Sequence, residues 1–370
     1  MAIEKLKKSR PTAPGYAASG VDTQKEESAM AGLLGWINKT FELRPGQGRV
    51  ALPIGYFANV LDLGNNLGLS ISTDGVGTKV LIAEMMDKYD TVGIDCIAMN
   101  VNDIICVGSE PISMVDYVAV QEINPSMVEQ IGKGLYEGCR MANINISGGE
   151  MAQVREMIKG KRKGRGFDIA GTCVGLVAMD KIIIGQDVKD DEVVVGFKSS
   201  GIHSNGMTMA RKVLMKDAGF GLDKYIGAFG RTLGEELLEP TRIYVKEVVE
   251  MMRSGVKIKA LAHITSDGLN NLTRTKAAVS YRIHHLPEPP PIFQLIQKTG
   301  KVSDQEMYRV FNMGVGFCVV VPPDDVARVI SIAGKHGTMA FEMGRAFLDD
   351  EREVVLEPKG LVGKDNDFFR

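Results

Sequence analysis

The sequence predicts a two-domain α/β protein. The chain has 370 residues, which is long for a single hydrophobic core. Strand-like and helix-like segments alternate along its first half, which ends in a strand at 167–178. A new apolar strand at 192–199 then starts a second pattern. We therefore expect an N-terminal domain at 1–180 and a C-terminal domain at 181–370.

The composition excludes several classes of protein. Net charge is −2 and the pI is about 6.3, which argues against a general nucleic-acid binder. No apolar run approaches the roughly 20 residues of a membrane span, and the basic N-terminus lacks the apolar region of a secretory signal. The 5 cysteines have neither metal-site nor disulfide spacing. These features predict a cytoplasmic protein with reduced thiols and with no nucleic-acid or membrane partner.

The first domain shows alternating helix and strand patterns up to its end. Helices are expected at 22–40, 90–108 and 125–143, and strands at 67–73, 113–120, 145–149 and 167–178. The helix at 90–108 is apolar except for a polar stripe. Asp95 and Asn102 lie seven residues apart on it, and Asp103 follows. Such a stripe serves either a structural hydrogen-bond network or a cation site, and both interpretations remain open.

A turn after the strand at 67–73 gives the clearest chemical signal. Two glycines, Gly75 and Gly77, separate a carboxylate from an ammonium group and allow close approach of a ligand. Asp74 suits Mg²⁺, and Lys79 suits a phosphate as a point charge. The spacing is not that of a Walker A loop, and an ordinary turn is the simplest alternative.

Two later stretches of the first domain carry charge beside glycine. Gly148-Gly149-Glu150 ends a strand and could bring a carboxylate to a metal–phosphate group. Residues 159–166 combine five positive charges with three glycines. A solvated loop is the simpler interpretation of that stretch, and a lid over an anionic substrate is the alternative.

The second domain contains a strand, a polar loop and a helix in succession. The loop runs from Ser199 to Gly206, and a helix is expected at 207–216. Ser204 or Asn205 is the expected N-cap. Free N–H groups at such a helix start favour an anion, and His203 in the same loop has a suitable pKa for proton handling.

A second anion site is predicted around Arg242. Pro240 suits the first position of a helix, which would place Arg242 in the first helical turn. The helix macrodipole disfavours a cation there. A bound phosphate would remove this conflict, so Arg242 is better explained by an anion than by helix stability. Further along, Ser303 to Glu306 matches a capping box, a strand is expected at 311–321 and a helix at 324–336.

Together these motifs resemble the phosphoribosylformylglycinamidine cyclo-ligase family, also called aminoimidazole ribonucleotide synthetases, of purine biosynthesis. The resemblance rests on segments distributed along both halves: Thr73–Lys79, Asp90–Asp95, Met99–Asp103, Gly108–Pro111, Asp116–Tyr117, Gly148–Glu150, Ser199–Gly206, Pro240–Lys246, Ala262–Thr265 and Met307–Gly316. Most are specific for the superfamily, and His-Ser-Asn-Gly and Pro-Thr-Arg-Ile-Tyr point to this member.

The resemblance implies an aminoimidazole-ribonucleotide-synthetase-like fold of two α/β domains. The N-terminal domain would have a mixed sheet and pair with its twin in a homodimer, which builds a β-barrel. ATP with Mg²⁺ would lie near that interface. The residues implied for the nucleotide are Asp74, Gly75, Gly77, Thr78, Lys79, Asp103 and Glu150, of which Asp74, Asp103 and Glu150 would bind the metal.

The resemblance also implies a reaction. Formylglycinamidine ribonucleotide would be cyclised to 5-aminoimidazole ribonucleotide with release of ADP and phosphate, after phosphorylation of its amide oxygen. Asp74, Lys79 and His203 are the catalytic candidates. The substrate-binding candidates are Ser204, Asn205, Thr241 and Arg242, the last two at the ribose phosphate.

Departures from the family pattern leave alternatives. Met151 to Arg155 differ from the usual sequence after Gly-Gly-Glu, and Ser266 and Asp267 replace glycines, although aspartate tolerates a left-handed backbone. One alternative is another phosphotransferase of the superfamily, such as thiamine-monophosphate kinase. Another is a non-catalytic nucleotide-binding subunit. The His-Ser-Asn-Gly motif argues against the first, and the intact acids argue against the second.

Overall fold

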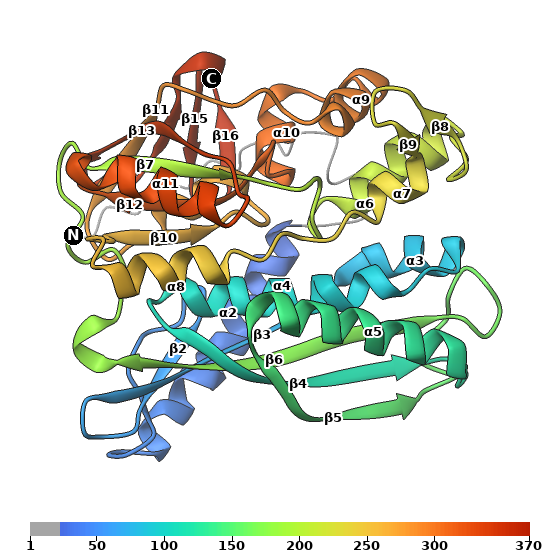
Figure 1. The fold of residues 1–370 in the computed structure, drawn as a ribbon, viewed down its shortest axis with the longest axis horizontal. Helices are drawn as coiled ribbons and strands as arrows, with labels where there is room; N and C mark the ends of the chain where they lie inside the picture. The colour runs from blue at the N-terminus through green and yellow to red at the C-terminus, as the bar shows by residue number, and fades with distance from the viewer. Residues whose placement is uncertain (1–22) are drawn as a thin grey trace, which may run out of the picture. The chain divides into compact units, whose positions relative to one another are not determined.

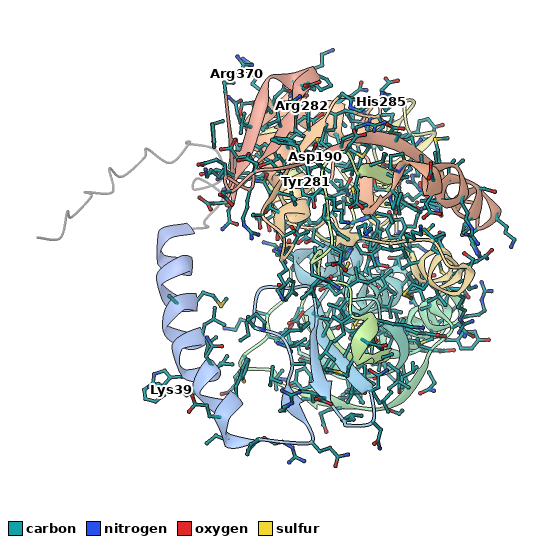
Figure 2. All side chains as sticks on the ribbon, turned by 90° about the vertical axis from the view of Figure 1, so that its left-hand side faces the viewer. Lys39, Asp190, Tyr281, Arg282, His285 and Arg370 are labelled. Atoms are coloured by element: carbon teal, nitrogen blue, oxygen red, sulfur yellow. The ribbon has the colours of Figure 1, made fainter. Side chains whose placement is uncertain are left out.

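The computed structural model describes residues 23–370, so the expected helix start at residue 22 lies outside the described residues. The chain divides into two compact units, Met1–Leu43 and Arg44–Arg370. In the first unit, helix α2 (Thr23–Ile37) continues into the 3-10 helix η1 (Asn38–Leu43). Trp36 is exposed there, and the Nζ atom of Lys39 lies 4.0 Å from the centre of its ring (Figure 2).

The second unit begins with a six-stranded mixed sheet in the order β1-β2-β3-β6-β4-β5. Its strands are β1 (Arg49–Val50), β2 (Asn59–Asp62), β3 (Leu67–Gly75), β4 (Glu110–Val120), β5 (Asn145–Gln153) and β6 (Phe167–Ala178). β4 and β5 are parallel, and the other pairs are antiparallel. The connecting helices are η2 (Gly77–Lys79), α3 (Val80–Met86), α4 (Asp90–Cys106) and α5 (Pro125–Ala142).

Helices α4 and α5 cover one face of this sheet (Figure 1). They pack closely because glycines face each other: a Cβ on Gly134 would lie 1.9 Å from the carbonyl oxygen of Asp90. Asn124 caps α5 by accepting a hydrogen bond from the Met127 amide at 2.9 Å. α4 is buried along most of its length because β10 and α8 of the second half cover its other side.

The opposite face of the six-stranded sheet is apolar, and the other described residues of the unit 44–370 leave it uncovered. The alternation of side chains along β3, β4 and β6 places large hydrophobic residues on it. These residues are 37–45% exposed, namely Leu67, Ile71, Val115, Tyr117 and Leu176. A face of this kind is typical of an interaction surface.

The second half forms an eight-stranded sheet in the order β10-β12-β7-β13-β11-β14-β15-β16. Its strands are β7 (Val193–Lys198), β10 (Ala260–His263), β11 (Val279–Ile283), β12 (Val315–Val321), β13 (Ala340–Leu348), β14 (Val354–Leu356), β15 (Leu361–Lys364) and β16 (Asp367–Phe369). β12 is buried on both faces, which explains its unbroken apolar run. On β11, Tyr281 is buried and its neighbour Arg282 is exposed, as strand alternation requires (Figure 2).

Several helices surround this second sheet, and a small hairpin joins β8 (Tyr225–Ile226) to β9 (Arg231–Thr232). The longer helices are α8 (Val245–Ser254), α9 (Pro291–Gly300), α10 (Asp304–Val310) and α11 (Val326–Lys335). The shorter ones are η3 (Met179–Lys181), α6 (Met207–Ala210), the π-helical η4 (Arg211–Asp217), α7 (Leu233–Leu237), η5 (Gly268–Thr273), η6 (Pro323–Asp325) and η7 (Glu357–Lys359). The predicted α/β class with a mixed first sheet is confirmed.

The two sheets separate near the expected boundary, because the first ends at Ala178 and the second begins at Val193. The division at residue 180 itself stays a prediction. Ser303 caps α10 by accepting from the Glu306 amide at 3.3 Å, which is one of the two bonds of the expected capping box. All five cysteines are buried and unpaired, also as expected. Within residues 23–370, none of the helices has both the length and the hydrophobicity of a transmembrane span.

Candidate functional site

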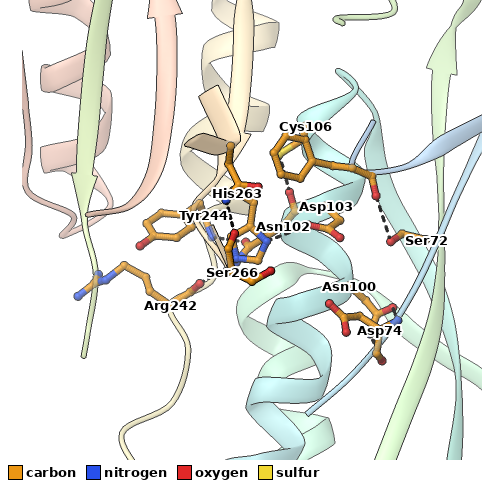
Figure 3. Close-up of polar contacts among 12 residues, drawn as sticks. Ser72, Asp74, Asn100, Asn102, Asp103, Cys106, Arg242, Tyr244, His263 and Ser266 are labelled. Carbon is orange, nitrogen blue, oxygen red and sulfur yellow. Dashed lines mark hydrogen bonds and ion pairs between the residues drawn. The ribbon is translucent and has the colours of Figure 1, made fainter. Parts of the chain in front are cut away.

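Polar side chains of α4 hold an irregular segment, residues 239–244, of the second half against the first (Figure 3). The Asn102 side chain donates to the carbonyl of Arg242 at 2.9 Å and accepts from the Tyr244 amide at 3.0 Å. Asp95 accepts from both the amide and the hydroxyl of Thr241, at 2.7 and 2.6 Å. The structural alternative for the polar stripe is therefore confirmed at Asp95 and Asn102.

Asp103, the third member of the stripe, makes no hydrogen bond to the segment 239–244. It lies near Asp74 instead. The Asn100 side chain fixes Asp74 by bonding to its backbone N–H and C=O, at 3.0 and 3.1 Å. Asp103 interacts with Nδ1 of His263 at 2.8 Å. Burial, and then the negative charge of Asp103, raise the pKa of Asp74 to about 6. Two carboxylates that repel each other in this way are suited to a divalent cation.

The position of Lys79 differs from the expectation for a phosphate ligand. Its side chain is 0% exposed and its Nζ atom lies 2.8 Å from Asp95. The same Nζ donates to the carbonyl of Glu239 at 2.5 Å. The ammonium group is thus occupied by protein partners, because the buried Asp95 carboxylate needs a counter-charge.

Glu150 does not join Asp74 and Asp103 within one chain. Strands β6 and β4 separate β3 from β5, which places the two backbones about 14 Å apart. Register puts Glu150 beside Tyr117, on the uncovered apolar face, whereas Asp74 shares a row with Gly149 on the face of α4. Within one chain the register therefore does not bring Glu150 to Asp74, and metal binding by Asp74, Asp103 and Glu150 stays a prediction. Among the described residues, no cluster of three or more His, Cys, Asp and Glu side chains suits a metal ion.

The middle of the turn is open to a ligand. Gly77 has φ +69°, and no atom lies within 4 Å of the position that a Cβ would occupy. Glycine is therefore favoured here by the backbone conformation and not by lack of space. Gly75 has no positive φ and ends β3. Thr78 is exposed, and its hydroxyl lies 2.9 Å from that of Thr208 in α6. Gly77 and Thr78 are accordingly the members of the turn that present themselves to solvent.

His203 lies in the loop at 199–206 but is buried, with 2% of its surface exposed. Its backbone has φ +65°, and its Nε2 accepts from the Ser200 amide at 3.3 Å. Burial, followed by the positive charges of His263, Lys79 and Arg242, holds the pKa of His203 well below its ordinary value. Through its Nε2 atom the imidazole holds the loop, as the structural alternative requires, and its proton handling stays a prediction.

Ser204 and Asn205 do not cap the following helix. The N-cap of α6 is Gly206, at φ +86° and without a side-chain cap, because a left-handed residue there turns the loop into the helix. The Ser204 hydroxyl is instead 3.4 Å from that of Thr241. Asn205 is half-buried beside it in sequence. The sequence predicted the position of the loop correctly, but its prediction of the N-cap residue of the following helix was wrong.

Arg242 lies before α8 rather than inside it, because α8 begins at Val245 and not at Pro240. The bonds to Asp95 and Asn102 keep the chain irregular up to Tyr244. Arg242 lines a pocket of about 390 Å³ together with Ser200, Lys246, Glu247 and His336.

The N–H groups of the Arg242 guanidinium differ in their hydrogen bonding. Nη1 donates to the Thr338 hydroxyl at 3.3 Å, whereas the buried Nε has no hydrogen-bond partner among the described residues. Burial raises the pKa of the neighbouring Glu247, and a hydrogen bond from Thr338 opposes that shift. The pocket lining contains an arginine, a lysine and a histidine, which can bind a phosphate group, together with the carboxylates of Glu137, Glu239 and Glu247.

The sequence reasoning missed Ser200, Lys246, His263 and His336 as site residues. Lys246 had a usable signal, since it follows Arg242 by four residues. His263 belongs to the Ala-His-Ile-Thr segment, whose spacing does not reveal its contact with Asp103. Asp267, in contrast, adopts the left-handed conformation expected of it, at φ +69°.

Comparison with protein families and known proteins assigns both halves. Residues 55–177 match the model "AIR synthase related protein, N-terminal domain", and residues 189–357 match the corresponding C-terminal domain. A phosphoribosylformylglycinamidine cyclo-ligase of Methanocaldococcus jannaschii is 48% identical over 94% of this chain and 95% of its own. One from Methanothermobacter thermautotrophicus is 46% identical over 92% and 96%.

More distant solved structures share the fold. One titled "AaThiL complexed with AMPPCP and TMP" aligns with a TM-score of 0.60 at 17% identity, over 91% of this chain and 96% of its own. A thiamine-monophosphate kinase from Stenotrophomonas maltophilia aligns with a TM-score of 0.58, also at 17% identity, over 87% and 95%. At this identity the likeness concerns the fold alone.

Proposed function

The chain belongs to the phosphoribosylformylglycinamidine cyclo-ligase family, and we propose that it closes formylglycinamidine ribonucleotide to 5-aminoimidazole ribonucleotide in an ATP-dependent step of purine biosynthesis. The single observation that supports this most is 48% identity to a relative of that name across nearly the full length of both chains. The thiamine-monophosphate kinase from Stenotrophomonas maltophilia is 17% identical, so a thiamine-phosphate kinase is the weaker candidate.

The chemistry requires an activated oxygen. The amide oxygen of the substrate attacks the γ-phosphorus of ATP and takes its phosphoryl group. ADP is the leaving group of this transfer. The amidine nitrogen then attacks the same carbon, the ring closes, and the C–O bond breaks to release phosphate with loss of a proton from nitrogen. Phosphoryl transfer needs mainly positioning and positive charge near the moving oxygens.

Asp74 and Asp103 are the residues that would hold Mg²⁺. Both offer carboxylate oxygens. Burial, and then the negative charge of Asp103, raise the pKa of Asp74, so a divalent cation would relieve an unfavourable arrangement. A bound Mg²⁺ would supply charge neutralisation at the phosphates of ATP. Gly77 and Thr78 would contact the same phosphates through the exposed side of the turn.

Arg242 would hold the phosphate of the ribonucleotide. Its pocket is also lined by Lys246, Ser200 and His336. The Nε–H group of Arg242 has no hydrogen-bond acceptor among the described residues. Ser204 and Asn205 would contribute from the neighbouring loop. Thr241 and His203 are buried, so they would shape this site rather than contact the ligand.

A homodimer would use the uncovered apolar face of the first sheet. Val115 and Tyr117 are 43% and 45% exposed on that face, and Glu150 lies beside Tyr117. In a dimer, Glu150 would face the partner and not its own Asp74. Val115→Glu would place a charge in the interface, and light scattering should then report a lower mass. An unchanged mass would contradict this interface.

The reaction can be tested directly with purified protein and Mg²⁺-ATP. ADP and 5-aminoimidazole ribonucleotide are followed together, with and without formylglycinamidine ribonucleotide. We expect one ADP per imidazole product and no ADP above background without substrate. An Asp74→Asn protein prepared in parallel measures contaminating ATPase. ATP turnover with thiamine phosphate instead would favour the kinase, and nucleotide binding without turnover would favour a binding subunit.

A further inference from the structure

The turn at 74–79 and the segment at 239–244 are joined by one buried network. Lys79 Nζ lies 2.8 Å from Asp95 and 2.5 Å from the carbonyl of Glu239. Asp95 in turn accepts from the amide and the hydroxyl of Thr241. The ammonium group therefore touches the second segment directly and through one carboxylate.

The three side chains of this network are excluded from solvent. The side chains of Lys79 and Asp95 are both 0% exposed, and Thr241 is 1% exposed. In such surroundings each hydrogen bond is strengthened by the low dielectric, and the geometry of the segment depends on all members being present. Arg242 follows Thr241 directly, so the position of its guanidinium depends on the same anchor.

We propose that Lys79 is a positioning residue for the ribonucleotide site, although it belongs to the turn that binds the nucleotide. Its ammonium group fixes Asp95, Asp95 fixes the backbone of Thr241, and Thr241 places Arg242 in its pocket. This inference rests on the proposed function for the identity of the two substrates. It predicts that disturbing Lys79 weakens ribonucleotide binding more than ATP binding.

The first test replaces the ion pair by a neutral pair. Lys79→Met combined with Asp95→Asn removes both charges, and the asparagine oxygen can still accept from Thr241. We expect KM for formylglycinamidine ribonucleotide to rise about tenfold, while KM for ATP changes less than about twofold. A rise in KM for ATP with an unchanged ribonucleotide KM would overturn the inference, because Lys79 would then act on the nucleotide.

The second test leaves the ion pair intact and removes one hydroxyl. Thr241→Val should raise the same KM severalfold, and Thr241→Ser, which keeps the hydroxyl, should restore it. Thr275→Val is the matched control: Thr275 is also a buried threonine, 8% exposed, but it bonds to Ala277 within its own loop. Equal effects of Thr241→Val and Thr275→Val, or no rescue by serine, would contradict a positioning role.

A third measurement does not depend on the identity of the substrates. The Thr241 amide donates to Asp95 at 2.7 Å, so its hydrogen exchange reports the anchor. In the free protein, exchange at 239–244 should be at least about tenfold faster in the double variant than in the wild type. Unchanged exchange would overturn the inference. If the wild type failed to turn over the ribonucleotide, the proposed function would fail while this measurement still decided the role of Lys79.

Discussion

The two ends of the turn at 74–79 lie five residues apart and differ in nearly every physical respect. Asp74 is partly exposed beside another carboxylate, and its pKa is raised to about 6. Lys79 is fully buried against an opposite charge. The charge at one end is thus unfavourable and has no ion-pair partner among the described residues, and the charge at the other end is paired within the protein. A single motif can therefore contain a ligand site and a structural anchor.

Breaking the satisfied end should cost the most stability. Lys79→Met leaves the Asp95 carboxylate buried without a counter-charge, which should lower the free energy of unfolding by about 3–5 kcal/mol. Urea denaturation measures this change. Lys212→Met makes the same substitution in an ion pair with Asp217 that is 33% and 48% exposed. There we expect less than about 1 kcal/mol, and similar losses at both sites would contradict the comparison.

The unsatisfied end should give a pH dependence. The folded protein holds a proton on Asp74 up to about pH 6, because its pKa is raised, whereas in the unfolded chain the pKa has its ordinary value of 3.8. The stabilising contribution is therefore complete below pH 3.8 and is lost as the pH rises through 6. Without metal, the wild-type free energy of unfolding should fall by up to about 3 kcal/mol relative to Asp74→Asn between pH 4 and pH 7. Urea denaturation of both proteins at the two pH values measures this difference, and parallel curves would refute the raised pKa.

The first half of the fold could be predicted because its signals are local. The strands β3 and β6 show period-two alternation, and α5 has an N-cap, a proline and an apolar stripe. The strands β13 to β16 were not predicted. They are short or interrupted by charged residues. β13 and β14 are stabilised by pairing with β7 and β11, which lie far away in sequence, and β15 and β16 extend the sheet from β14.

The site could be predicted in its residue types but not in its pairings. Asp74 and Asp103 lie close enough for the charge of Asp103 to act on Asp74, while their metal role stays a prediction. The side of the sheet taken by Glu150 depends on register, where a shift of one residue reverses the face. The burial of Lys79 depends on Thr241 and Glu239, more than 140 residues further along. No local pattern reports contacts of this range.

Asp74→Asn sharpens the comparison by removing charge at nearly constant volume. We expect turnover to fall by about 100-fold, since a charged group near transferring phosphates acts mainly through electrostatics. Thermal unfolding should show the protein still folded. Asp180→Asn is the control, because Asp180 follows the opposite end of the same sheet and bonds to Asn66. Full turnover in the Asp74 variant would remove this residue from the metal site.

The smallest expected effect concerns Arg242, the residue that the buried anchor positions. Arg242→Ala removes a charged donor from the pocket of about 390 Å³, and KM for formylglycinamidine ribonucleotide should rise about tenfold, the loss of one charge-assisted hydrogen bond. KM for ATP should hardly change, because the proposed nucleotide contacts are at Asp74, Gly77 and Thr78 and not in this pocket. Arg253→Ala is the control, since Arg253 pairs with Glu110 on the surface. Steady-state kinetics with each substrate varied in turn separates the two sites. A change in KM for ATP alone would mean that Arg242 acts on nucleotide binding. The division of the turn into a ligand end at Asp74 and an anchor end at Lys79 would then be wrong.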